Sequence, residues 1–164
     1  MSGDLVNVNQ DIVTETLETY AQLGVFRAFA CISRSKTEVR YRMQWHKDRF
    51  FDLTFHPAQR ALRFEAVLPN APAQMYADFK RFVAERQSDA LPEHRRIDSR
   101  KVRITCSRTK GDIALLFRAK DGEVEYAVRK LIDLVHQVYQ VFLRDGLYYE
   151  YMIGTFEVDR DQLS

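Results

Sequence analysis

The chain has little of what marks a secreted, membrane-spanning or disordered protein. Its 164 residues include two cysteines and six glycines, and 46% of them are hydrophobic against 29% charged. No apolar run approaches the ~18 residues that a membrane span requires, and residues 1–10 lack the basic start and apolar core of a signal peptide. We therefore expect a single cytoplasmic domain over residues 1–164, with residues 147–164 as an aromatic tail that is extended or forms a short helix.

Motifs for catalysis and for cofactor binding are also missing. The four histidines (His46, His56, His94 and His136) lack the short spacings of metal ligands, and no glycine-rich phosphate loop occurs. Thr105-Cys106-Ser107 has no paired base that the sequence identifies. We therefore expect no catalytic residue, no metal and no cofactor, and we interpret Cys31 and Cys106 as buried, reduced thiols.

Charge is unevenly distributed along the chain. The formal net charge is +2, yet residues 1–24 contain no lysine or arginine, and acidic residues outnumber basic ones in residues 145–164. The middle of the chain is therefore strongly basic, and a cluster there comprises Arg95, Arg96, Arg100 and Arg103. Such a cluster can neutralise phosphates, or it can be a solvated surface whose arginines pair with nearby carboxylates.

Hydrophobic periodicity predicts an ordered series of helices and strands. A first helix, capped by Asn9 or Asp11, ends at Gly24. Strands are then expected over residues 25–35, 38–47, 49–56 and 60–68, followed by a helix after Pro72, a hairpin over 101–107 and 112–119, and a long helix from Val124 to Phe142. We expect the strand over 25–35 to be covered on both faces. The order α-ββββ-α-ββ-α predicts an α+β domain with an antiparallel meander sheet packed by helices.

The long final helix has more apolar surface than one sheet requires. Its main stripe repeats every three or four residues, and further apolar residues lie beside that stripe. Either the C-terminal tail or a second subunit must cover the remaining surface. We identify a candidate partner-binding surface on this helix, formed by Val128, Leu131, Val135, Tyr139 and Phe142.

The hairpin and the start of the final helix carry a resemblance to a known family. The stretch Gly111-Asp112-Ile113-Ala114-Leu115-Leu116-Phe117, then Asp121-Gly122-Glu123-Val124 and a long helix, resembles the type III secretion chaperone-like fold, including the bacterial YbjN family. The resemblance covers about residues 9–144 and is one of architecture. It implies a homodimer that holds partner segments without catalysis, and it transfers no site residue.

Three functions are left open by these observations. The first is a non-enzymatic, cytoplasmic protein-binding domain, chaperone-like or regulatory and homodimeric, that docks a partner on the long helix or a sheet edge and has no membrane partner. The alternative is a nucleic-acid or anionic-ligand binder that uses the arginine cluster. The third is a small-molecule pocket between sheet and helices, lined by Tyr41, Phe51, Phe55 and Phe64.

Overall fold

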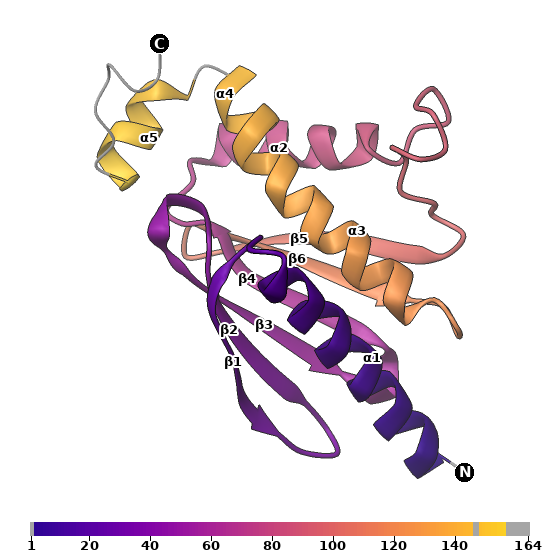
Figure 1. Cartoon of the computed structure of the whole chain (residues 1–164). Coiled ribbons are helices and arrows are strands. Elements are labelled where there is room, and N and C mark those ends of the chain that lie inside the picture. The colour runs from indigo at the N-terminus through magenta and orange to yellow at the C-terminus, as the bar shows by residue number, and fades with distance from the viewer. Residues whose placement is uncertain (1, 146–147, 157–164) are drawn as a thin grey trace.

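The computed structural model describes residues 2–145 and 148–156 and has the predicted α+β order (Figure 1). The helices and strands are α1 (Ser2–Gln22), β1 (Arg27–Arg34), β2 (Val39–Gln44), β3 (Phe50–His56), β4 (Ala61–Leu68), α2 (Ala73–Glu85), β5 (Val102–Thr109), β6 (Asp112–Ala119), α3 (Val124–Gln137), α4 (Leu143–Asp145) and α5 (Tyr149–Phe156). A π-helical turn, Val138–Phe142, joins α3 to α4. None of the described helices is long and apolar enough to cross a membrane.

All six strands form one antiparallel sheet in the order β1-β2-β3-β4-β6-β5. The first four strands are a meander, and the hairpin returns so that β6, rather than β5, pairs with β4. β1 and β5 are therefore the two edges of the sheet. This arrangement confirms the predicted sheet of consecutive antiparallel strands and adds the strand order, which the sequence did not give.

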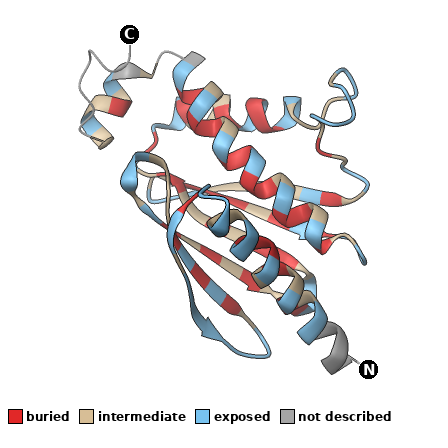
Figure 2. Ribbon diagram, viewed as in Figure 1, coloured by how far each residue is buried: buried red, intermediate tan, exposed pale blue. Residues whose placement is uncertain are grey.

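The helices cover one face of the sheet and leave the other open (Figure 1). The alternation in β2 shows the two faces: Val39, Tyr41 and Met43 are fully buried, whereas Arg40 and Arg42 are exposed (Figure 2). Because successive side chains of a strand point to opposite faces, the buried set faces the helices and the arginines face away from them. The sheet is thus half-buried, as the alternation predicts.

The first helix starts earlier than expected. It begins at Ser2, so Asn9 and Asp11 lie inside it and do not cap it, and that part of the prediction is wrong. The polar side chains there contact the sheet: Gln10 Nε2 donates to the carbonyl of Ser35 (2.7 Å), and Asp11 pairs with Arg34 (2.9 Å). Asp11, one of the two residues expected to cap the helix, therefore helps Gln10 to anchor α1 to the end of β1.

Two irregularities alter the predicted side-chain pattern. Ala66 in β4 has a left-handed backbone (φ 45°) within an irregular stretch between Phe64 and Leu68, so Val67 and Leu68 are both buried and Ala66 is not. The long helix is also not uniform, because the π-helical turn interrupts it. A π turn adds one residue to a helical turn and so rotates the following side chains about the axis.

Candidate binding surfaces

β1 is the most exposed strand of the sheet, which contradicts the expectation that it is covered on both faces. Seven of its eight residues are exposed, and Phe29, the other one, is half-buried against Tyr41. The physical reason is the position of β1 at the sheet edge, where no further strand lies beside it. Figure 2 shows this strand in pale blue at the border of the sheet. Its small residues (Ala28, Ala30 and Ser33) could have signalled a poorly covered strand, since they fill little core volume.

Three of the large exposed hydrophobic residues lie in β1 or in the connection that leads to it. The large exposed hydrophobic residues of the described chain are Val8, Leu23, Val25, Ile32 and Phe50. Ile32 is in β1, Leu23 and Val25 are in the connection that leads to β1, and Val8 is in α1, which contacts β1. Between Arg27 and Arg34 the strand carries no charge. An uncharged edge strand with unpaired backbone groups is a template for pairing with another chain.

The opposite edge, β5, is protected. Arg103 and Arg108 add charge to it, and Tyr76 of α2 donates its hydroxyl to the carbonyl of Cys106 (3.1 Å). Arg108 Nε also donates to the carbonyl of Ala71 (2.8 Å), which ties the end of β5 to the segment before α2. In the part of the chain that the structure describes, no side chain from another element bonds to the backbone of β1 in this way. The two edges therefore differ in their capacity to accept a new strand.

The predicted partner-binding residues of the long helix are core residues, so that prediction is wrong. Their exposed fractions are 0% for Val128, Leu131 and Val135, 6% for Tyr139 and 7% for Phe142. Their neighbours come from the same chain. Phe142 contacts Phe79 and Phe82 of α2, and the C-terminal segment adds Tyr148 against Phe142 and Phe156 against Tyr139. The chain's own α2 and C-terminal segment thus cover this surface, so of the two covers that the sequence left open, the structure has the tail and not a second subunit.

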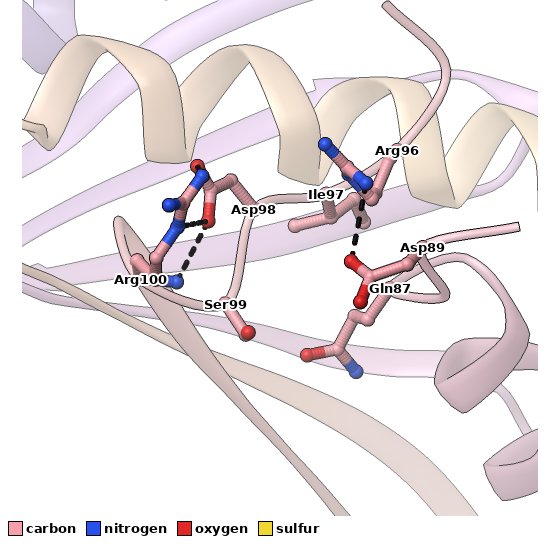
Figure 3. A pocket seen from close by; sticks show the side chains of 7 residues that line it. All are labelled: Gln87, Asp89, Arg96, Ile97, Asp98, Ser99 and Arg100. Atoms are coloured by element: carbon pink, nitrogen blue, oxygen red, sulfur yellow. Dashed lines mark hydrogen bonds and ion pairs between the residues drawn. The ribbon is translucent and has the colours of Figure 1, made fainter. Parts of the chain in front are cut away.

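The predicted basic cluster is dispersed, and two of its four arginines are paired with carboxylates. Arg96 pairs with Asp89 (3.1 Å), and Arg100 makes a two-nitrogen contact with Asp98 (3.1 and 3.2 Å) around a hollow of about 320 Å³ (Figure 3). The hydrogen bonds from Arg100 hold the pKa of Asp98 below its usual value. Arg95 lines a different hollow, which also contains Asp133. The four predicted arginines therefore do not form one basic surface, and Arg103 alone faces a hollow without carboxylates.

Four cations that the sequence did not group together surround that last hollow. Its lining contains Arg60, Arg103, Arg118 and Lys120, together with Gln59, Ser99 and Ala119, and its volume is about 310 Å³. These residues come from the turn before β4, the loop before β5 together with the start of β5, and the end of β6 with the residue that follows it. Sequence reasoning missed the group because its members meet only when β6 lies between β4 and β5.

Aromatic and histidine side chains connect the turn after β2 with the π-helical turn. The His46 ring lies between the rings of Trp45 and Tyr139, with centroids 4.5 Å from each, and the ring of His136 is 5.3 Å away. His46 Nε2 is buried without a hydrogen-bond partner in the described chain. Burial, with smaller effects of His136 and Lys47, lowers the pKa of His46 to about 4. The ring is therefore neutral at pH 7.

The side chain of Arg49 also contacts this aromatic cluster. Its guanidinium carbon lies 4.8 Å from the centre of the Phe51 ring and 5.5 Å from that of Phe156, and Nη1 donates to the hydroxyl of Tyr139 (3.0 Å). The Tyr139 hydroxyl in turn donates to the carbonyl of Val67 (2.5 Å). A charged group enclosed by aromatic faces and bonded to a buried hydroxyl is satisfied, so the arrangement is structural.

Two further predictions are corrected by burial. Cys31 is a free, exposed thiol and not a buried one, because it lies on the edge strand; Cys106 is a free, half-buried thiol whose pKa burial raises to about 11. Tyr41, Phe51, Phe55 and Phe64, suggested as the lining of a pocket, are 0–1% exposed and belong to the core. Among the described residues, no three histidine, cysteine or acidic side chains converge as a metal site.

The fold and these surfaces define an α+β domain with a two-layer core, one unprotected sheet edge and one basic hollow. Comparisons with protein-family models, with curated proteins and with solved structures found no match. The resemblance to type III secretion chaperones and the YbjN family therefore stays a prediction from the order of the elements.

Proposed function

We propose that this protein is a non-enzymatic protein-binding domain, and that β1 accepts an extended segment of another polypeptide as a seventh strand. The observation that carries the proposal is the uncharged, exposed edge between Arg27 and Arg34. Main-chain hydrogen bonds would provide the affinity, and side chains of the added strand would provide the specificity. The chaperone-like role and the cytoplasmic location that the sequence predicts are part of this proposal.

The strand itself indicates the chemistry of the segment. The centre of β1 offers small and apolar side chains, and Ile32 is 51% exposed, so an uncharged segment rich in β-branched residues fits it. Cationic side chains lie at both ends of the strand. Arg27 pairs with Asp48 and Arg34 with Asp11, and all four side chains remain at least 41% exposed. Acidic residues flanking the bound segment would share these exposed arginines with Asp48 and Asp11.

Pairing with a second copy of the chain fits less well. If two β1 strands paired antiparallel about their centres, Arg27 of one copy would lie opposite Arg34 of the other. Like charges directly opposite each other on neighbouring strands are destabilising. We therefore propose a different protein as the partner, and the homodimer becomes an outcome that the experiment distinguishes.

The test uses a synthetic, fluorescently labelled peptide of alternating valine and threonine flanked by glutamates. Binding to the full chain is followed by fluorescence anisotropy, and amide hydrogen exchange locates the contact. We expect slower exchange over residues 27–34. Ala30→Lys with Ile32→Lys adds edge charges and should weaken binding at least tenfold, since about 1.4 kcal/mol corresponds to that factor.

A charge on the opposite edge is the matched control. Thr105 is an exposed residue of β5, and Thr105→Lys should leave both the affinity and the exchange of β1 unchanged. Protection of β5 instead of β1, or no peptide binding, would refute the proposal. Light scattering on the same samples measures self-association; a dimer that Ala30→Lys and Ile32→Lys dissociate would show that a second copy takes this edge instead of another protein.

A further inference from the structure

The hollow lies where β4 and β5 begin and where β6 ends, and all the charged side chains that line it are positive. Arg60, Arg103, Arg118 and Lys120 contribute four formal positive charges, and the lining contains no carboxylate. Arg103, Arg118 and Lys120 are exposed, and their side chains have no hydrogen-bond or ion-pair partner within residues 2–145 and 148–156. The nearest carboxylate in the loop before β5, Asp98, is already bonded to Arg100.

Two of these cationic side chains lie directly opposite each other on neighbouring strands. Arg103 and Arg118 are register partners on β5 and β6, so their side chains leave the same face at neighbouring positions. Side chains in such pairs have Cβ atoms about 5 Å apart, and like charges there are destabilising. A bound anion would remove this repulsion, and functional sites often cost stability in the free protein.

Arg60 is held in place beside this pair. It precedes β4 in a left-handed conformation (φ 50°), and its Nε donates to the carbonyl of Ala119 (3.1 Å). Its carbonyl accepts a hydrogen bond from the amide of Ala119 (2.9 Å). The guanidinium is thereby fixed near the end of β6, and its two Nη nitrogens have no partner in the described structure, which leaves them available to a ligand.

The donors and the size of the hollow indicate the class of ligand. Guanidinium groups bind phosphate oxygens through two parallel hydrogen bonds, and the lysine adds a mobile point charge. A volume of about 310 Å³ is at the lower end of the range for small-ligand sites. No aromatic side chain lines the hollow, so a nucleobase has no surface on which to stack. We propose that this hollow binds a compact ligand that carries two or more phosphate groups.

Calorimetric titration of the full chain with sodium tripolyphosphate at low salt tests the site. We expect saturable one-to-one binding that is at least about tenfold tighter than that of orthophosphate and that weakens as sodium chloride is added. Arg103→Gln and Arg118→Gln should each lower the affinity about tenfold or more, because each removes charge-assisted hydrogen bonds. Arg118→Lys keeps the charge but loses the planar donor geometry, and an intermediate affinity is expected.

Arg40→Gln is the matched control, because Arg40 is an exposed arginine on the same open face and no side-chain partner is described for it. Its affinity for tripolyphosphate should stay within about twofold of the parent. An equal loss in Arg40→Gln, or no binding at low salt, would overturn the site. Tighter binding of a ten-residue oligothymidylate than of tripolyphosphate would overturn the compact ligand in favour of nucleic acid.

Thermal unfolding separates a binding role from a structural one. Without ligand, Arg103→Gln should leave the melting temperature unchanged or raise it, because the repulsion with Arg118 is removed. With tripolyphosphate, the parent should melt at a higher temperature and the variant should not. A variant that is less stable without ligand would show that the arginine pair supports the fold, which contradicts the proposal.

Discussion

The ring of His46 lies flat against the ring of Tyr139, with centroids 4.5 Å apart and 7° between the planes. This contact joins the turn after β2 to the π-helical turn after α3, two segments about 90 residues apart in the chain. The buried Nε2 of this imidazole has no hydrogen-bond partner in the described structure. A neutral, desolvated histidine at such a junction makes the stability of the fold depend on pH.

Stability should fall as the solution is acidified from pH 7 to pH 5. The folded pKa of His46 is about 4, below the ordinary 6.5, so the unfolded chain binds more protons between these values. The contribution is complete above about pH 6.5 and is lost as pH falls towards 4. We expect a loss of about 1–2 kcal/mol, after allowance for solvent screening, measured by urea unfolding at each pH.

The histidine variants provide the controls for this pH dependence. His46→Phe keeps an aromatic ring against Tyr139 and should flatten the pH dependence, whereas His94→Asn, in the exposed loop before β5, should not change it. An unchanged slope in His46→Phe would contradict the assignment.

Removal of one hydroxyl should weaken the same junction. Tyr139→Phe leaves Arg49 Nη1 and the carbonyl of Val67 without their shared partner. The free energy of unfolding should fall by about 1–3 kcal/mol, because buried polar groups then lack hydrogen bonds. A double-mutant cycle with Arg49→Lys should show a coupling energy of about 0.5 kcal/mol or more. Additive effects of the two substitutions would show that the hydrogen bond contributes nothing.

Truncation of the helix core should destabilise the isolated chain. Leu131→Ala removes a fully buried side chain, and a loss of about 2–5 kcal/mol is expected in chemical denaturation. Gln140→Ala, at an exposed position of the π-helical turn, should change stability by less than about 0.5 kcal/mol. If Leu131→Ala were harmless in the single chain and impaired only association, the residue would be part of an interface and not of the core.

Two glycines should respond with opposite sign to the same substitution. Gly24 ends α1 with φ +80°, and although a Cβ there would meet nothing within 4 Å, Gly24→Ala should cost about 1 kcal/mol through backbone strain. Gly154 in α5 is not in the left-handed region, and a Cβ there would also meet nothing within 4 Å. Gly154→Ala should therefore be neutral or should stabilise the fold by up to about 1 kcal/mol. Thermal unfolding measures both, and equal effects would contradict the conformational explanation.

Local pattern predicted the elements because each one is amphipathic on its own. The stripe of apolar residues in α2 (Met75, Phe79, Phe82 and Val83) and the alternation of β2 can each be read within one segment of the sequence, and they coincide with the buried residues of those elements. The coverage of β1 was not visible in this way. It depends on which strand lies at the edge of the sheet, and that is a property of the whole topology.

In the candidate sites too, the sequence predicted what one segment shows, and the topology decided the rest. The excess apolar surface of α3 was recognised correctly, yet the sequence could not decide whether a second subunit or the chain itself covers it. The structure gives this role to α2 and the C-terminal segment, through Phe79, Phe82 and Tyr148. Likewise, Arg103 was selected, but Arg60 and Arg118 were not, because 58 residues separate them along the chain and the pairing of β4 with β6 brings them together.

The insertion of β6 between β4 and β5 has a consequence for synthesis of the protein. One edge of β4 pairs with β3 and the other with β6. When β4 leaves the ribosome, β6 has not been translated, because it begins only at Asp112. At ordinary translation rates the nascent meander waits on the order of seconds with that apolar strand unpaired. Until then the unpaired edge of β4 is open to pairing with another chain, and a fragment that stops short of Asp112 keeps that edge exposed.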